Sequence, residues 1–246
     1  MRRIETALLR CPNRHDVRAV AGVFDLLQDR QSASGLRDTY STPLGWLYDF
    51  GVNTRPLARL AGRLEWGADI ERMFRWMEAG LKVPAGDVVL DVPVGGGTSY
   101  AAGAPDLEGL LLGVDVSPWM LSRAAIRRER NRLATCVVLA RADATALPLV
   151  DRSVIRILSF NGLHVIADKP AAMREFRRVL EPGGELIGTT LVSDCARPYS
   201  AIVALERLAP FFVPPARAEL ASLARQVGFR RWEVELDGGL LFFRGE

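Results

Sequence analysis

The stretch Val88-Val-Leu-Asp-Val-Pro-Val-Gly-Gly-Gly-Thr-Ser99 decides the fold. Its first half is a short apolar run, bounded by Pro84-Ala85-Gly86 before it and by three consecutive glycines after it. Such a run is typical of a buried parallel strand, expected here over Asp87 to Val92, and a helical pattern restarts near Thr98. Glycines at a turn from strand to helix let backbone N–H groups approach a ligand, because no Cβ holds it away. The stretch therefore predicts a cofactor-binding loop.

Two familiar phosphate-binding loops fit this spacing poorly. The dinucleotide fingerprint G-x-G-x-x-G needs a third glycine at position 100, where Tyr100 follows Gly95 and Gly97. A phosphate loop of the Gly-Lys-Ser/Thr type needs a lysine, and none lies nearby. What remains is Asp91, an acid shortly before the glycines, which suits a ligand with cationic or hydroxyl groups. S-adenosylmethionine (SAM), with its sulfonium, α-amino group and ribose, is such a ligand.

Two more acids follow predicted strands. The apolar run Leu110 to Val114 ends at Asp115, and the strand expected over Cys136 to Ala140 is followed by Asp143. In an open parallel sheet, ligands bind at the carboxyl ends of the strands, and a carboxylate there can accept hydrogen bonds from both ribose hydroxyls. Each acid alone would also fit a helix N-cap or a turn. Three acids at successive strand ends predict a shared ligand site, with Asp143 expected at the adenine amino group.

In these segments the chain resembles the class I SAM-dependent methyltransferases, most closely the small-molecule enzymes related to ubiquinone and menaquinone methyltransferases. The matching segments, in chain order, are Leu90 to Gly97, Gly113 to Leu121, Ala142 to Pro148, Ser159 to His164 and Glu175 to Gly184. The resemblance implies an α/β fold with a Rossmann-like, mostly parallel, seven-stranded sheet, an antiparallel last strand and helices on both faces. It also implies SAM as the cofactor and S-adenosylhomocysteine (SAH) as its product.

Residue by residue, the resemblance implies a set of cofactor contacts. These are Asp91, Pro93, Gly95, Gly97, Asp115, Val116, Met120, Asp143, Ala144 and Asn161. Pro93 stands where the family usually has the first glycine of its loop, and proline removes one backbone N–H donor. Asn161 is expected near the methionine or methyl end of SAM.

Two parts are predicted along the chain. Residues 1–83 should form a helical cap that shapes the substrate site, with helices over Ala19 to Leu27 and Ile70 to Leu81. The resemblance places Tyr48 and Asp49 of this cap near the substrate. Residues 84–246 should form the SAM-binding domain, with 193–215 as a lid. The remaining expected elements are strands at 154–160, 185–192, 229–236 and 240–243, the last two as a hairpin, and helices at 168–180 and 216–227.

Methyl transfer to a small organic acceptor is the predicted function, at oxygen, carbon or nitrogen of a quinone-like, lipid-like or specialised metabolite. Alignment of the reacting atoms can supply much of the catalysis. If a proton must leave the acceptor, His164 is the candidate base, although the sequence favours a histidine that packs near SAM or the pocket wall without accepting a proton. The alternative is a protein of the same fold that uses the pocket for binding, regulation or a non-methylating reaction. A nicotinamide-dependent oxidoreductase is disfavoured by Tyr100.

Composition bounds the remaining possibilities. With 246 residues, 49% of them hydrophobic, and a net charge of +3, the chain can bury a sizeable core. Cys11, Cys136 and Cys195 lack metal-ligand spacing, so we expect no metal site and a reducing cytoplasm. No run reaches membrane-spanning length. The basic stretch 127–132 is expected to be a solvated helix end rather than a nucleic-acid site. The oligomeric state is left open.

Overall fold

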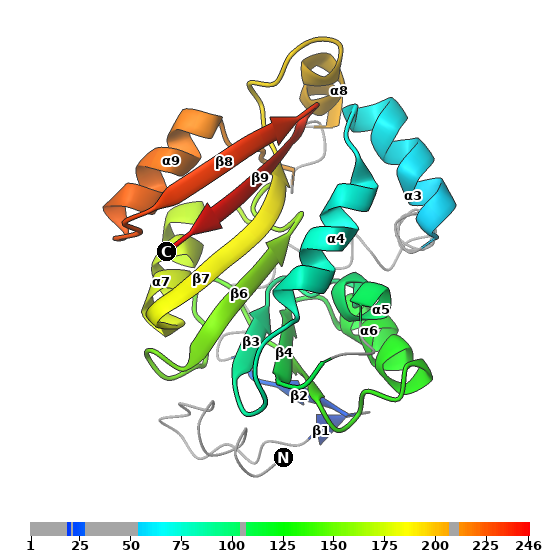
Figure 1. Cartoon of the computed structure of the whole chain (residues 1–246), viewed down its shortest axis with the longest axis vertical. Coiled ribbons are helices and arrows are strands. Elements are labelled where there is room, and N and C mark those ends of the chain that lie inside the picture. Colours follow the sequence, from blue (N-terminus) through cyan, green and yellow to red (C-terminus); the bar gives the residue numbers. More distant parts are fainter. Residues whose placement is uncertain (1–18, 21, 28–53, 104–106, 207–211) are drawn as a thin grey trace.

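A single twisted sheet forms the centre of the protein (Figure 1). The computed structural model describes residues 19–20, 22–27, 54–103, 107–206 and 212–246. Within them, the sheet has nine strands in the order β1-β2-β5-β4-β3-β6-β7-β9-β8. Their bounds are β1 Ala19–Val20, β2 Val23–Asp25, β3 Val88–Asp91, β4 Leu110–Asp115, β5 Val137–Arg141, β6 Val154–Phe160, β7 Leu180–Leu191, β8 Trp232–Asp237 and β9 Leu240–Gly245.

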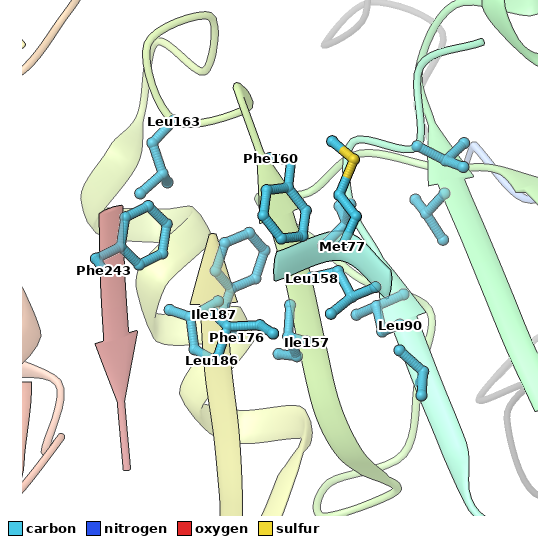
Figure 2. Packing of buried hydrophobic residues seen from close by; sticks show 14 of the residues in the cluster. Met77, Leu90, Ile157, Leu158, Phe160, Leu163, Phe176, Leu186, Ile187 and Phe243 are labelled. Carbon is cyan, nitrogen blue, oxygen red and sulfur yellow. The ribbon is translucent and has the colours of Figure 1, made fainter. Parts of the chain in front are cut away.

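The centre of the sheet is parallel, as the apolar runs predict. β3 pairs with β4 on one side and with β6 on the other, and β5 and β7 extend the sheet outward. Register places Ile157 beside Leu186 and Leu158 beside Ile187, and Figure 2 shows these side chains in the core. Because the chain runs from β3 toward β5 and then returns to β6, the strand order reverses at β3. Ligands bind at such a reversal in open α/β sheets.

The last two strands confirm the predicted antiparallel ending. β9 lies between β7 and β8 and is antiparallel to both. Trp232 of β8 stacks on Phe243 of β9, with ring centroids 5.4 Å apart. The turn at Gly238 and Gly239 approaches the segment before α4, where Gly239 N–H donates to the Trp66 carbonyl at 2.6 Å. The turn between β8 and β9 is therefore hydrogen-bonded to the segment that precedes α4.

The helix predicted over Ala19 to Leu27 is wrong. The described part of this segment forms β1 and β2, an antiparallel pair in which β2 also runs parallel to β5. Gly22 has a φ of 75°, a left-handed conformation that glycine adopts without cost and that turns the chain between the two strands. The seven predicted strands are thus joined by two more, and residues 1–83 are not purely helical.

Two groups of helices cover the two faces of the sheet (Figure 1). α4 (Ile70–Gly80), α5 (Thr98–Gly103) and α6 (Pro118–Arg130) form one group, and α7 (Lys169–Val179) and α9 (Arg217–Gln226) form the other. In α4 the predicted apolar face is buried and includes Ile70, Met73, Phe74 and Met77. A shorter helix, α3 (Arg55–Ala61), continues as a π-helical turn, η3 (Gly62–Trp66), just before α4.

Some boundaries and surfaces differ from expectation. β7 begins at Leu180 rather than at 185, because an irregularity opposite Val154 and Arg156 accommodates the residues between Leu180 and Glu185. The basic end of α6 is not simply solvated. Arg128 is 9% exposed and donates to the Gly22 carbonyl at 3.0 Å, and Arg127 donates to the Gly96 carbonyl. Among the described residues, no helix is long and apolar enough to cross a membrane.

Candidate functional site

A cavity of about 350 Å³ opens at the carboxyl ends of β3, β4, β5 and β6. It lies where the strand order reverses, as expected for a ligand site in this kind of sheet. Nine of the ten residues that the sequence assigns to the cofactor line it, and they come from the ends of β3 and β4, from the four loops that follow β3, β4, β5 and β6, and from α6. These nine are Asp91, Pro93, Gly95, Asp115, Val116, Met120, Asp143, Ala144 and Asn161.

The loop after β3 is held open by Asp115. Its Oδ2 accepts the Gly95 N–H at 2.9 Å, and its Oδ1 accepts the Ser117 N–H at 2.8 Å. Gly95 has a φ of 52°, and a Cβ built there would meet no atom within 4 Å. Gly95 therefore presents bare backbone to open space in the cavity wall, a cradle in which a ligand can approach closely.

Gly97, the tenth predicted residue, does not line the cavity. A Cβ at Gly97 would lie 2.2 Å from the hydroxyl oxygen of Tyr100, and φ is 83°. Tyr100 is fully buried and donates from its hydroxyl to the Ala124 carbonyl of α6 at 2.6 Å. The residue that departs from the dinucleotide fingerprint thus joins α5 to α6, and Gly97 makes room for its ring.

Two buried carboxyl groups give the cavity its electrostatic character. Burial raises the pKa of Asp91 to about 7, with a further rise from Asp115 and a partial reduction by the hydrogen bond from the Ser99 hydroxyl. Burial also raises the pKa of Asp115 to about 6, against hydrogen bonds from Ser117, Gly95 and Val116. A cationic group placed between them would stabilise their ionised forms.

Asp143 is preorganised by Thr145, two residues further along the loop after β5. Its Oδ1 accepts both the backbone N–H and the hydroxyl of Thr145, at 2.8 and 2.7 Å. Both Asp143 and Thr145 line the cavity. The loop conformation therefore fixes the carboxylate at the edge of the site, as the strand-end argument predicts.

Asn161 directly follows β6 and has a left-handed conformation, with a φ of 54°. Its side-chain oxygen accepts from the Thr189 hydroxyl at 3.1 Å, and its Nδ2 lies 3.6 Å from the sulfur of Met73. Asparagine tolerates this backbone conformation better than most residues do. The amide is thereby held between β7 and α4 at the cavity wall.

His164 is buried and is not among the cavity-lining residues. Its Nδ1 accepts the Leu191 N–H at 3.2 Å, and its ring lies 5.1 Å from that of Phe212. Burial, together with nearby Lys169, lowers the pKa of His164 to about 3, so the ring is neutral at physiological pH. These contacts give His164 a structural role, and its role as a base stays a prediction without support from this geometry.

Sequence reasoning missed part of the cavity wall. Met73 and Met77 of α4 line the cavity, as do Phe160 and the segment Val165–Asp168 after β6. The helical spacing of Met73 and Met77 indicated burial but did not show what they face. Tyr48 and Asp49 lie outside the described residues. Of the predicted lid, Phe212 and Val213 contact His164, and none of its described residues lines the cavity.

The chain is similar to known methyltransferases. Residues 89–184 match the family described as Methyltransferase domain. The chain is 30% identical to the O-methyltransferase rstn1 of Aspergillus nomiae over 163 residues, 65% of this chain and 72% of that protein. It is 28% identical to the ubiquinone/menaquinone biosynthesis C-methyltransferase UbiE of Stenotrophomonas maltophilia over 194 residues, 68% and 76% of the two chains.

The fold is also found in solved structures. One is phosphoethanolamine N-methyltransferase 2 of Haemonchus contortus in complex with SAM, with a TM-score of 0.60 and 18% identity over 71% of this chain and 52% of that chain. Several relatives are longer, and the chain spans 39% to 59% of the length of four curated methyltransferases that it matches. The chain belongs to the class I SAM-dependent methyltransferase family, as its motifs predict.

Proposed function

We propose that this chain transfers the methyl group of SAM to a small organic acceptor and releases SAH. The observation that carries the proposal is that nine of the ten residues assigned to the cofactor line one cavity, at the strand reversal of a methyltransferase fold. SAM, when bound, supplies a methyl group on a positively charged sulfur, which is already a good leaving group. The protein's residues then have to bind, orient and exclude water.

The three strand-end aspartates divide the cofactor among them in this proposal. Asp115 accepts hydrogen bonds from the ribose hydroxyls, and Asp143 accepts from the adenine amino group. Asp91, buried and with a raised pKa, faces the cationic part of the ligand and ionises when that charge arrives. The open space at Gly95 fits a ligand that packs on bare backbone. The residues present therefore fit SAM.

Elsewhere on the cavity lining, α4 supplies Met73 and Met77, and the loop after β6 supplies Asn161. The cap segment 54–83 would thus form part of the acceptor site, where it orients the acceptor and keeps water out. No proton acceptor is assigned, since His164 stands outside the cavity. The relatives include both O- and C-methyltransferases, so oxygen, carbon and nitrogen acceptors of quinone-like, lipid-like or specialised metabolites all belong to the proposal.

The proposed setting is the cytoplasm, without a nucleic-acid partner. Cys136 and Cys195 are free thiols among the described residues, which suits a reducing compartment. Arg127 and Arg128, in the basic stretch, are engaged with backbone carbonyls of this chain rather than displayed as a row of free cations.

The test has two stages. Calorimetric titration with SAM, SAH and NAD identifies the cofactor, and micromolar binding of the two sulfur ligands without NAD binding is expected. The protein is then incubated with a small-molecule extract and an equal mixture of ordinary and methyl-deuterated SAM, and products are detected as paired masses. SAM binding without any paired product would favour the non-methylating alternative. Binding of NAD in place of SAM would overturn both.

A further inference from the structure

We infer that the acceptor end of the cavity selects a largely apolar acceptor that is neutral or positively charged, and that it rejects carboxylates and phosphates. We define the acceptor end as the wall formed by Met73, Met77, Phe160, Val165, Ile166 and Asp168. This inference rests on the proposed function, which assigns the adenine to Asp143 and the ribose to Asp115 and so leaves this wall for the acceptor.

The wall of the acceptor end is apolar and adaptable. Met73 and Met77 are 2% and 4% exposed and present thioethers from neighbouring turns of α4. Phe160 adds an aromatic ring, and Figure 2 shows it close to Met77. Methionine side chains are flexible and polarisable, so they pack against apolar ligands of varied shape. An acceptor with a large apolar part would therefore bury that part here.

The charged side chains among the described residues of the cavity lining are all acidic. Among the described residues that line it, the charged side chains are Asp91, Asp115, Asp143 and Asp168, and no lysine, arginine or histidine is present. The proximity of Asp115 already raises the pKa of Asp91. An anionic acceptor would add another negative charge, and none of the described lining residues carries a positive charge to pair with it. Burial of an unpaired charge is costly.

Two basic side chains, those of Arg127 and Lys169, donate hydrogen bonds to backbone carbonyls of residues that line the cavity. Arg127 donates to the carbonyl of Gly96, and Lys169 donates to the carbonyl of Ile166 at 3.0 Å. Neither side chain is among the described residues that line the cavity. They support the backbone of the wall and do not present their charges as a receptor for an anion.

Asp168 sets the charge of the acceptor end. It is exposed and lines the cavity just before α7, and its Oδ1 accepts the Ala171 N–H at 2.9 Å as the helix N-cap. A helix N-terminus otherwise attracts anions. Because the carboxylate of Asp168 already occupies that position, the start of α7 does not offer a site for a carboxylate or phosphate of the acceptor.

A matched set of probes tests the inference on the full chain loaded with SAH. The probes share one aryl-alkyl group and differ in charge: 4-phenylbutan-1-ol, 4-phenylbutylamine and 4-phenylbutyrate. Titration calorimetry near neutral pH is expected to show the alcohol and the amine binding at least about tenfold tighter than the carboxylate. Equal or tighter binding of 4-phenylbutyrate would overturn the inference, and so would failure of all three probes to bind the loaded protein.

Variants at Asp168 make the test specific. Asp168→Asn keeps an N-cap and removes the charge, and it is expected to tighten 4-phenylbutyrate binding by about fivefold, with a larger gain in Asp168→Lys. Glu108→Gln removes an exposed carboxylate at the opposite end of β4 and should change nothing. Unchanged binding of 4-phenylbutyrate in Asp168→Lys would overturn the assignment of Asp168. The SAH titration used to load each protein reports separately on the proposed function.

Discussion

The carboxylate of Asp115 accepts the Gly95 N–H at 2.9 Å, so the acid that ends β4 fixes the loop that follows β3. Its second oxygen holds the Ser117 N–H at the start of α6. One side chain thus joins three segments of the chain at the site where a ribose is proposed to bind. Loss of this side chain should affect both the cofactor contact and the shape of the loop.

Asp115→Ala is expected to weaken SAM binding by at least about tenfold, since it removes a charged hydrogen-bond acceptor and releases Gly95. Asp115→Asn retains one acceptor oxygen and should fall between the wild type and the alanine variant. Calorimetric titration with SAM measures the effect, and Glu108→Gln serves as the charge-matched control. Wild-type affinity in Asp115→Ala would refute the ribose assignment.

Gly95→Ala and Gly97→Ala form a matched pair, because both glycines have a positive φ and only Gly97 is crowded. We expect Gly95→Ala to cost only about 1 kcal/mol of stability but to weaken SAM binding, since its Cβ enters the open cradle. Gly97→Ala should cost about 3 kcal/mol or more, because its Cβ also collides with the Tyr100 ring. Urea denaturation and SAM titration separate the two effects. Equal losses of stability would contradict the role of Tyr100.

The ligand-free protein should lose stability as pH rises from about 4 to about 7. The folded-state pKa values of Asp91, about 7, and Asp115, about 6, lie above their ordinary value of 3.8. The folded state therefore binds protons that the unfolded state has already released, and this advantage disappears as pH rises through those values. His164 opposes this trend, because its folded-state pKa of about 3 lies below its ordinary value of 6.5. The melting temperature of the wild type relative to that of Asp91→Asn should therefore fall by several degrees across this range. Asp91→Asn should flatten the slope, and an unchanged slope in that variant would show that Asp91 does not carry it.

SAM binding should respond to pH in the opposite direction. The cationic ligand pairs with ionised carboxylates, so affinity is expected to rise between about pH 5.5 and about pH 8. Binding near pH 6.5 should release protons, and calorimetry in buffers of different ionisation enthalpy detects them. Absence of proton release would mean that both carboxyl groups are already ionised in the free protein.

His164→Asn is expected to retain most of the methyl-transfer activity, because asparagine can still accept the Leu191 N–H. His164→Ala should lose about 2 to 4 kcal/mol of stability, since it leaves a cavity and an unpaired buried N–H. The measurements are urea denaturation and the dependence of activity on pH. If the rate of the wild type falls with a pKa near neutrality and His164→Asn abolishes that dependence, His164 is a base after all.

The strands and the acids that line the cavity could be predicted because each depends on local sequence. Buried parallel strands are apolar runs, and an acid directly after such a run falls at the ligand-binding edge, as Asp91, Asp115 and Asp143 do. The helix assigned to Ala19–Leu27 failed for the opposite reason. Its apolar spacing is ambiguous over so short a segment, and pairing with β5, far along the chain, decides its conformation.

The acceptor side could not be predicted to the same extent. Met73 and Met77 are placed at the cavity by the packing of α4 on the sheet, which no local pattern encodes. His164 follows a strand toward the ligand edge, yet its ring turns to the Leu191 N–H. The order of residues after each predicted strand showed which of them lie near the ligand-binding ends of the strands. The direction of each side chain, in contrast, depends on its tertiary neighbours.

The pairing of β2 with β5 has a consequence for solubility. Asp25 and Arg141, ion-paired across these strands, are 116 residues apart in sequence, so this edge closes only after much of the chain has collapsed. Until then β5 displays unpaired backbone groups, a template for association with other chains. A fragment that starts at residue 54 would keep all the cavity-lining residues described here but lose this protection, and it should aggregate more readily than the full chain. β1 and β2 therefore protect the edge of the sheet at β5 from association with other chains.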